Sequence, residues 1–424
     1  HKEFANIIQE LSEKQGEVSP EQIMDEFRAN YLEMKEPVHF KKLKVDDLSD
    51  TILDPSIPEG GTVSLENNYS YESGDVVSGI DIDKDLTIDG KGYTINANHN
   101  AAIFNVIGDT HLVLINITFI GGNSTTNGGA INVVSGGSVD IIDCTFIDNT
   151  AANQGGAIYI ADNAPTTVTS TIRGSKFESN SAVSGGAIYV TGSSLNISST
   201  GFSKDVAKSY GGSVFIDGVL HITQTTFDND RAGSGGAIYL NDTFQIYSTI
   251  EGSTFTDSYA TGDGGAVYVS ADNVHMKDLR FIDNTAGDDG GAIFWEGTTG
   301  VMDNITAIGN KGISIDKPDG TTSSTRGGTI CLTGSDVIIN HSQFSLSSAY
   351  MDEDKDYSKV DGGALFITGD NVNIVDTTFN NCSATHDGGA IYIIGNNTLV
   401  DNCTFDDCTV DNCGGVIYVE GNDI

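Results

Sequence analysis

The chain has 424 residues, of which 59 are acidic and 21 are basic, so its formal charge is −38. This charge opposes binding to nucleic acid and to anionic lipid, and we expect neither as a partner. No run of about 18 apolar residues occurs, so no membrane span is expected within the chain. The chain also contains 51 glycines, one tryptophan and six cysteines.

The first fifty residues differ in pattern from the rest of the chain. Apolar residues between Phe4 and Leu11 fall at helical spacing, and Ser19-Pro20-Glu21-Gln22 combines an N-cap, a proline at the first helical position and a capping-box glutamine. We therefore expect residues 1–50 to form a short N-terminal α-helical segment. It either covers the first coil of the next domain as a cap or forms a separate docking module.

From residue 128 onward the chain repeats a Gly-Gly pair that is followed by one small residue and then Ile, Val or Leu. Eight of the ten successive spacings fall between 24 and 30 residues. The repeat is too short for a propeller blade, and its sequence is too polar for paired helices. It favours a coil of short strands. The first glycines of the eleven pairs are Gly128, Gly155, Gly185, Gly211, Gly235, Gly264, Gly290, Gly327, Gly362, Gly388 and Gly414.

A second repeated mark, of the type Thr-Phe-x-x-Asn, lies about half a repeat before most glycine pairs. Its fullest form runs from Cys144 to Asn149, and Ala307 replaces the phenylalanine once. Asn tolerates left-handed backbone and Gly has no Cβ, so both marks indicate corners between short β-branched strands. Equivalent strands of successive coils would pair at roughly 4.8 Å, with the phenylalanines stacked in one buried column. The sequence thus predicts an all-β fold, a right-handed parallel β-helix over residues 51–424.

The paired Gly-Gly-Ala-Ile and Phe-x-x-Asn marks resemble those of adhesin-like surface proteins of methanogenic archaea and of chlamydial polymorphic outer-membrane proteins. The stretch from Asp85 to Ile95 is also similar to the first coils of pectate-lyase-like β-helices. The resemblance covers about residues 80–424. It implies a pectate-lyase-like solenoid displayed on a cell envelope, archaeal in the first case, as an extracellular adhesin and glycoprotein.

The second residue after the small residue of each glycine motif is aromatic in nine of the eleven repeats. If the aliphatic residues beside it point inward, strand alternation places these rings on the outer face as a column. Exposed aromatic columns stack on sugars or bury against a partner. The alternative is that the faces are reversed or that another segment covers the column. The expected ligand-binding residues are Tyr159, Tyr189, Tyr239, Tyr268 and Tyr392.

Two consecutive repeats are longer than the others, with spacings of 37 and 35 residues. Both place their extra length between the Phe-x-x-Asn corner and the next glycine pair, so the long loops at 311–326 and 348–361 should emerge side by side. Asp352, Asp354 and Asp356 alternate along the second loop like the ligands of a calcium loop, although Tyr357 stands where such loops have glycine. The loop either binds calcium or is a solvated acidic loop.

Modification sites and cysteines add weaker signals. Ten Asn-x-Ser/Thr sequons occur, and the candidate glycosylation sites are Asn68, Asn123, Asn241 and Asn396, of which we expect a minority to carry glycans. Cys382 and Cys408 share one repeat column and form either a disulfide or, as we favour, a ladder of buried thiols. No Cys-x-x-Cys pair or neighbouring histidine suggests zinc at the cysteines.

An enzyme on this fold would need clustered carboxylates with a basic residue. The chain has five arginines, none in a recognisable lyase motif, and histidines such as His341 and His386 occur singly without an evident aspartate pair. We therefore expect no enzyme, with a polysaccharide lyase or glycoside hydrolase as the alternative. The expected function is adhesion, through glycan or protein on a partner cell or through neighbouring copies in a surface layer. Because the chain stops at Ile424 just after a strand, we expect further coils or an anchor beyond it.

Overall fold

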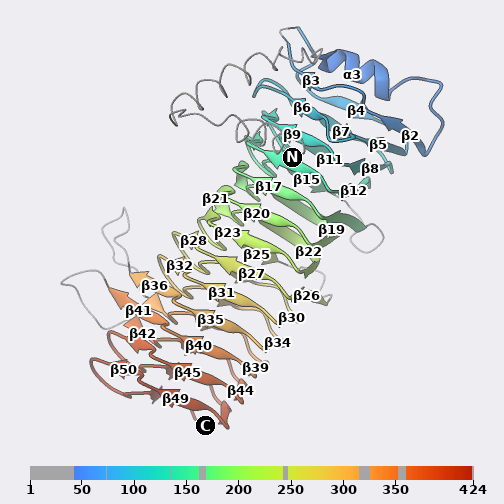
Figure 1. Cartoon of the computed structure of the whole chain (residues 1–424). Coiled ribbons are helices and arrows are strands. Elements are labelled where there is room, and N and C mark those ends of the chain that lie inside the picture. Colours follow the sequence, from blue (N-terminus) through green and yellow to red (C-terminus); the bar gives the residue numbers. More distant parts are fainter. Residues whose placement is uncertain are drawn as a thin grey trace, which may run out of the picture. The chain divides into compact units, whose positions relative to one another are not determined.

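The computed structural model describes residues 43–72, 74–134, 136–161, 169–241, 247–314, 325–351 and 360–422. Over this part of the chain it forms the predicted right-handed parallel β-helix, with about 13 turns (Figure 1). The helices expected between residues 1 and 42 lie outside the described residues. The described residues contain no helix with the length and apolar character that crossing a membrane requires.

The β-helix unit begins at residue 43, eight residues before the expected start at residue 51. Strand β1 (Leu43–Lys44) pairs with β3 (Tyr69–Ser70), and helix α3 (Val45–Ile52) follows it directly. The Asp47 carboxylate accepts a hydrogen bond from the backbone N–H of Lys44 at 2.9 Å, which caps the first turn. Leu48 and Ile52, four residues apart on one side of the helix, are fully buried in the core.

One face of the β-helix is a sheet of 14 parallel strands, here called the phenylalanine face. Its phenylalanines point inward and stack on one another, with ring centroids 4.8 Å apart between Phe146 and Phe177 and again between Phe227 and Phe255. The predicted buried column is therefore confirmed. The strands after β1 and β3 are β6 (Thr94–Asn96), β9 (Thr118–Ile120), β13 (Thr145–Ile147), β17 (Lys176–Glu178), β20 (Gly201–Ser203), β23 (Thr226–Asp228), β27 (Thr254–Thr256), β31 (Arg280–Ile282), β35 (Thr306–Ile308), β40 (Gln343–Ser345), β45 (Thr378–Asn380) and β49 (Thr404–Asp406).

The next face along each coil is a sheet of 11 short strands, here called the short-strand face. A short connection leads from it to the glycine pair, and both long repeats leave the β-helix from this face. Its strands are β10 (Asn123–Ser124), β14 (Thr150–Ala151), β18 (Ser181–Ser184), β21 (Val206–Tyr210), β24 (Arg231–Ala232), β28 (Tyr259–Ala260), β32 (Thr285–Ala286), β36 (Lys311–Ser314), β41 (Ser348–Met351), β46 (Ser383–Ala384) and β50 (Thr409–Val410).

The largest sheet has 24 strands, mostly two per coil, and is here called the tyrosine face. The strands that follow the glycine pairs form its first row, and the next strands of each coil form its second row. The first row holds β4 (Ile80–Ile82), β7 (Phe104–Val106), β11 (Ile131–Val133), β15 (Ile158–Ala161), β25 (Ile238–Asn241), β29 (Val267–Val269), β33 (Ile293–Trp295), β38 (Ile330–Leu332), β43 (Leu365–Ile367), β47 (Ile391–Ile393) and β51 (Ile417–Val419). The second row holds β2 (Gly61–Ser64), β5 (Leu86–Asp89), β8 (His111–Ile115), β12 (Ser138–Ile142), β16 (Thr169–Arg173), β26 (Ser248–Glu251), β30 (Val274–Lys277), β34 (Gly300–Asp303), β39 (Val337–Asn340), β44 (Asn373–Val375) and β48 (Leu399–Asp401), while β19 (Ile188–Ser198) and β22 (Val214–Thr223) run through both rows.

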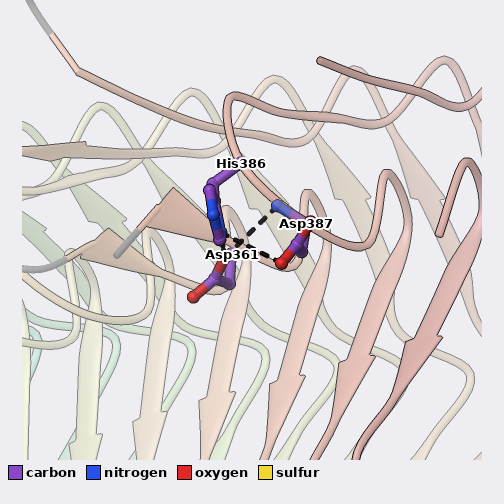
Figure 2. Close-up of side chains that lie close together, drawn as sticks. All are labelled: Asp361, His386 and Asp387. Carbon is purple, nitrogen blue, oxygen red and sulfur yellow. Dashed lines mark hydrogen bonds and ion pairs between the residues drawn. The ribbon is translucent and has the colours of Figure 1, made fainter. Parts of the chain in front are cut away.

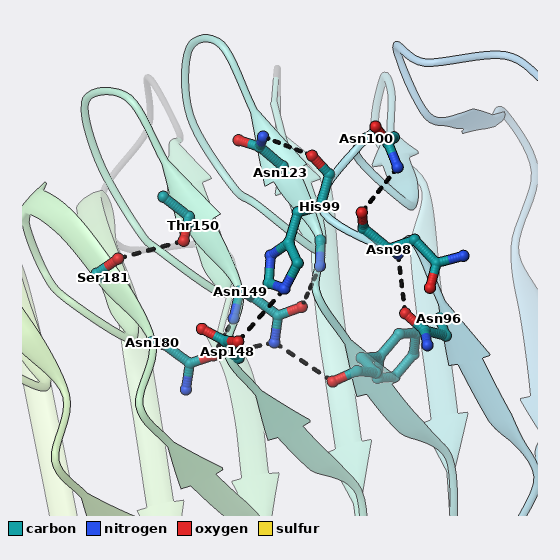
Figure 3. A network of polar contacts seen from close by, with 12 residues as sticks. Asn96, Asn98, His99, Asn100, Asn123, Asp148, Asn149, Thr150, Asn180 and Ser181 are labelled. Carbon is teal, nitrogen blue, oxygen red and sulfur yellow. Dashed lines mark hydrogen bonds and ion pairs between the residues drawn. The ribbon is translucent and has the colours of Figure 1, made fainter. Parts of the chain in front are cut away.

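The two repeated marks form corners, as the sequence predicts. Gly155 has a φ of +64°, and a Cβ on Gly156 would clash with the carbonyl oxygen of Gly186 in the next coil, so neither position accepts a larger residue. At the other corner the fully buried Asn149 side chain donates to Oδ1 of Asn180 at 2.9 Å and accepts from the N–H of Gly122 at 2.8 Å (Figure 3). These amides satisfy buried backbone groups from coil to coil.

Candidate functional site

The predicted aromatic column forms one ladder on the outer side of the first row of the tyrosine face. Strand pairing places Tyr159 opposite Tyr189 and Tyr239 opposite Tyr268, with their inward-facing neighbours fully buried. Ring centroids of adjacent members lie 4.5 to 5.6 Å apart from Tyr159 to Phe294, and interplanar angles reach only 25°. The aromatic side chains therefore lie on the outer face, as strand alternation predicts.

The stacking changes what this ladder can offer to a ligand. A ring with neighbours at about 5 Å on both sides turns its edge and its hydroxyl outward, so a sugar cannot lie flat against it. Partial burial raises the pKa of the Tyr189 and Tyr239 hydroxyls to about 12, so both remain protonated hydrogen-bond donors. A ligand-binding role for the five tyrosines stays a prediction. In this arrangement a ligand would contact their hydroxyl groups and not their ring faces.

Tyr210 offers the exposed ring that the ladder lacks. Its side chain is 45% exposed and belongs to the residue directly before a glycine pair. The ring lies 4.8 Å from that of Tyr239 and 6.4 Å from that of Phe215, tilted by 55° and 46°. Because it stands across the ladder, part of its face stays open to solvent. The repeat pattern does not reveal Tyr210, because the equivalent position in other repeats is mostly polar.

The ends of the two insertions lie beside the later part of the ladder. The residues at the end of each insertion, in β37 (Thr325–Arg326) and β42 (Val360–Asp361), pair with each other as a separate two-stranded sheet. The guanidinium of Arg326 stands over the Phe366 ring at 5.2 Å, next to the place where Cys331 interrupts the ladder. Phe366 and Tyr392 are 2% and 7% exposed. Of the expected ligand residues Tyr392 is therefore covered, whereas the other four are half-buried. Asp352, Asp354 and Asp356 lie outside the described residues.

An acidic row flanks the covered part of the ladder. Its members directly precede four of the glycine pairs and are Asp263, Asp289, Asp361 and Asp387. Asp289, 6% exposed, forms an ion pair with Arg326 at 3.1 Å and accepts a hydrogen bond from the backbone N–H of Arg326 at 2.9 Å. Burial raises the pKa of Asp289 to about 7, although the Arg326 charge opposes this shift. A carboxyl group with such a pKa exchanges protons near neutrality.

His386 completes a cluster in the same row. Its Nδ1 lies 2.8 Å from Oδ1 of Asp361 and 3.1 Å from Oδ2 of Asp387 (Figure 2). The two carboxylates come from successive coils, and both directly precede a glycine pair. The expectation that no aspartate pair lies near a histidine was therefore wrong. The signal was in the sequence: Asp361 and Asp387 are one 26-residue repeat apart, and His386 adjoins the second.

A shallow depression of about 440 Å³ lies where the phenylalanine and short-strand faces meet. The side chains of Arg231 and Tyr259 pack together in it, with the guanidinium 5.7 Å from the ring centroid. Its walls are mainly carboxylates and amides, which are hydrogen-bonding partners for hydroxyl groups. The lining residues are Asp228, Asn229, Arg231, Asp257, Ser258, Tyr259, Asp283 and Thr285.

The candidate glycosylation sites differ in accessibility. Asn123 and Asn396 are exposed, but their amide groups donate to the carbonyl oxygen of His99 at 2.8 Å and to Asp370 at 3.1 Å, respectively. Asn68 and Asn241 are half-buried. A glycan on Asn123 or Asn396 would displace these hydrogen bonds. Whether any of the four carries a glycan stays a prediction.

The cysteines of the last coils are free thiols in this structure. Cys382 is fully buried and Cys408 is half-buried, in the column that asparagine occupies in other coils. The hydrogen bond with Cys408 and, as the second cause, burial raise the pKa of the Cys382 thiol. This arrangement agrees with the favoured prediction that Cys382 and Cys408 form a ladder of thiols.

A comparison with known protein families supports the repeat. The Chlamydia polymorphic membrane protein repeat matches residues 143–161, 174–191 and 278–294, which contain several of the glycine and phenylalanine marks. No curated protein matches the chain. The match covers only part of the chain, and the archaeal side of the resemblance stays a prediction.

Solved structures with a similar course of the chain include glycan-related proteins. An alginate lyase in complex with G6 has 9% identity and a TM-score of 0.39, over 90% of this chain and 88% of that one. Tailspike protein 3 of bacteriophage CBA120 has 12% identity and a TM-score of 0.34, and this chain covers 65% of its length. The tailspike protein of E. coli bacteriophage HK620 in complex with a pentasaccharide has 12% identity and a TM-score of 0.30. Similarity at this level carries no argument about ligands. The chain is similar to these proteins and to the chlamydial repeat, and neither comparison assigns it to a family.

Proposed function

We propose that this chain is an extracellular, cell-surface display protein with an adhesive function. Its β-helix serves as a rigid scaffold and presents the tyrosine face, with the insertions beside it, to a glycan or protein of another cell or to neighbouring copies in a surface layer. The observation that carries this proposal is the half-exposed ladder of ring edges and hydroxyls around the tilted, exposed ring of Tyr210. The similarity to the chlamydial repeat supports a surface location.

The proposed binding face suits an uncharged ligand. Tyr210 supplies an open ring face, and Tyr189 and Tyr239 supply protonated hydroxyls within the same few coils. A saccharide ring that stacks on one aromatic side chain and accepts hydrogen bonds from neighbouring hydroxyls uses such a combination. With a formal charge of −38 the protein should repel polyuronates, so neutral glycans are the favoured class.

The test is a glycan array with the full chain, the Tyr210→Ala variant and the Tyr247→Ala variant. Tyr247 is a matched control, because it is also 45% exposed but lies outside the ladder, with its hydroxyl 2.8 Å from His275. Loss of one stacking contact should weaken binding about 3- to 10-fold in Tyr210→Ala and leave Tyr247→Ala unchanged. Equal binding by all three proteins would remove Tyr210 from the site.

Calcium is proposed at the second insertion. Three alternating carboxylates would order the loop around a bound ion and make adhesion sensitive to chelators. Adhesion that is the same with calcium and with chelator would contradict this part of the proposal.

A second candidate function is carbohydrate-active catalysis, favoured by the acidic row. Asp289 has a pKa of about 7, Arg326 lies beside it, and His386 with its two aspartates is in the same row. Such groups can exchange protons with a sugar and hold a carboxylate substrate. Product release from neutral glycans or polyuronates that is lost in Asp289→Asn would establish this candidate over the adhesive one.

A further inference from the structure

The side chains of Asp361, His386 and Asp387 converge on a single point. One imidazole nitrogen, Nδ1 of His386, lies within 3.1 Å of oxygens from both carboxylates, and the three groups offer ligand atoms within 4.8 Å of one another (Figure 2). A single N–H bond can point at only one of two acceptors. Tetrahedral zinc with bonds of about 2.0 to 2.1 Å places its ligand atoms about 3.3 Å apart, close to the two nitrogen–oxygen separations here.

The backbone of successive coils holds the two carboxylates in this orientation. The N–H of Asp387 donates to Oδ1 of Asp361 at 3.2 Å. The N–H of Cys413 and the side-chain amide of Asn412 donate to Oδ1 of Asp387, at 2.8 and 3.0 Å, which leaves Oδ2 directed at the imidazole. Outer hydrogen bonds of this kind fix metal-binding carboxylates before an ion arrives.

The charge balance of the cluster favours a cation. Asp361 and Asp387 are 7% and 5% exposed, and among the described residues His386 is the one basic side chain within ion-pair distance of them. Burial of a carboxylate costs free energy unless it is paired or bound to a metal. Two buried carboxylates with one imidazole leave negative charge uncompensated, and a divalent ion would neutralise it.

Two other clusters show by contrast what is particular to this one. His341 also lies between two aspartates, but Asp303 contacts its Nδ1 at 2.9 Å and Asp376 its Nε2 at 3.6 Å, and the side chain is 61% exposed. These contacts diverge from the ring as in an ordinary surface ion pair. The carboxylates around Asp289 converge as well, but they include no nitrogen ligand, and the Arg326 guanidinium already supplies a positive charge there.

We propose that Asp361, His386 and Asp387 bind one divalent cation of the zinc class, with a remaining coordination position free for water or a ligand. Imidazole with two carboxylates suits zinc, whereas calcium takes six to eight oxygen ligands at longer distances. Because Asp361 is the last residue of the second insertion and His386 lies in the next coil, the ion would tie the end of that insertion to the β-helix. This site is separate from the calcium proposed within the loop.

The test measures zinc binding by the purified full chain, after removal of metal with a chelator, by calorimetry and by metal analysis after dialysis. We expect one zinc ion per chain in the wild type and in His341→Ala, the matched control. His386→Ala should bind zinc about 100-fold or more weakly. Absence of stoichiometric zinc in the wild type, or equal binding by His386→Ala, would overturn the proposal.

A second measurement avoids reliance on a variant that fails to fold. Crystals of the wild type grown with zinc should give an anomalous peak in contact with Nδ1 of His386 and with both aspartates. A peak at His341 or elsewhere, without one at His386, would refute the site. Excess calcium should leave the peak in place, and its displacement by calcium would contradict the assignment to the zinc class.

Discussion

Replacing Asp230 by asparagine should stabilise the protein, and more so as the pH rises. Asp205 and Asp230 occupy two successive positions of the buried corner column that Asn149, Asn180, Asn284 and Asn310 occupy in other coils, and both are fully buried. At the asparagine positions the side-chain amide donates to a phenylalanine carbonyl of the preceding coil, as Asn284 does to Phe255 at 3.0 Å. An ionised aspartate has no such donor.

The hydrogen bonds of Asp230 show what the substitution would gain. Its Oδ1 accepts from the N–H of Asp205 at 3.0 Å, but its Oδ2 is buried without a hydrogen-bond partner. Burial, together with the neighbouring charge of Asp205, raises the pKa of Asp230 well above its usual value. An asparagine keeps the Oδ1 contact and supplies an N–H for the Phe202 carbonyl, a net gain of about 1 kcal/mol over the ionised aspartate.

The pH dependence follows from the raised pKa. In the unfolded chain Asp230 loses its proton above about pH 4, whereas in the folded chain it keeps it to a higher pH. Over that window the folded state binds more protons, so the free energy of unfolding falls as pH rises, by up to about 1.4 kcal/mol per pH unit for this group. Asp230→Asn removes this slope. Its advantage over the wild type should therefore increase as the pH rises above about 4, by up to about 1.4 kcal/mol per pH unit, until the folded chain also loses this proton.

The assay is denaturant unfolding between pH 4 and pH 8, with hydrogen exchange to locate the effect in the coils around residue 230. Asp228→Asn is the matched control, because it removes a neighbouring aspartate whose side chain is exposed. The control should shift the free energy of unfolding by no more than about 0.5 kcal/mol. An Asp230→Asn protein that is less stable than the wild type at pH 7, or that keeps the wild-type slope, would refute the reasoning.

Three further outcomes follow from the same structure. Phe227→Ala removes a ring that is 1% exposed and stacked between Phe202 and Phe255, so it should lower the free energy of unfolding by about 3 to 5 kcal/mol. Hydrogen exchange should show the loss only in nearby coils, and Phe405→Ala, at a half-buried ring, should cost less. Shortening both insertions to the ordinary spacing should leave the β-helix folded by circular dichroism yet abolish binding to the partner cell or polymer, and unchanged binding would place the site on the tyrosine face alone. Incubation with polyuronates and neutral glycans, with and without calcium, should release no unsaturated products or reducing ends, and turnover that depends on one aspartate would overturn the adhesive proposal.

The columns that build the core were predictable because each depends on one residue type at one repeat position. Stacking of Phe146 on Phe177 and the positive φ of Gly155 follow from the period and from local geometry alone. The outward side of the tyrosine column followed from strand alternation. The way in which this column can contact a ligand was not predictable, because the strand spacing that puts Tyr239 beside Tyr268 also makes each ring cover the face of the next.

The candidate sites escaped prediction for a different reason. Asp361 and His386 are 25 residues apart, and their contact depends on two adjacent coils staying in register after two long insertions. The tilt of Tyr210 depends on its packing against Phe215 and Tyr239, which no periodic pattern specifies. The strand pairings that form the β-helix are specified by similar residues in most repeats, whereas each of these contacts occurs once.

The position before each glycine pair is where the repeat leaves room for chemistry. The residues that follow it must be glycines, because one has a positive φ and a side chain on the other would strike the next coil. The position itself lies at the edge of the tyrosine face, outside the phenylalanine column, so its side chain is free to vary without a loss of core packing. The residues at this position include Tyr210, Asp289, Arg326, Asp361 and Asp387. The exposed ring, the carboxyl group with a pKa near 7 and the convergent histidine cluster all include it, so one row of corners concentrates the chain's capacity for recognition.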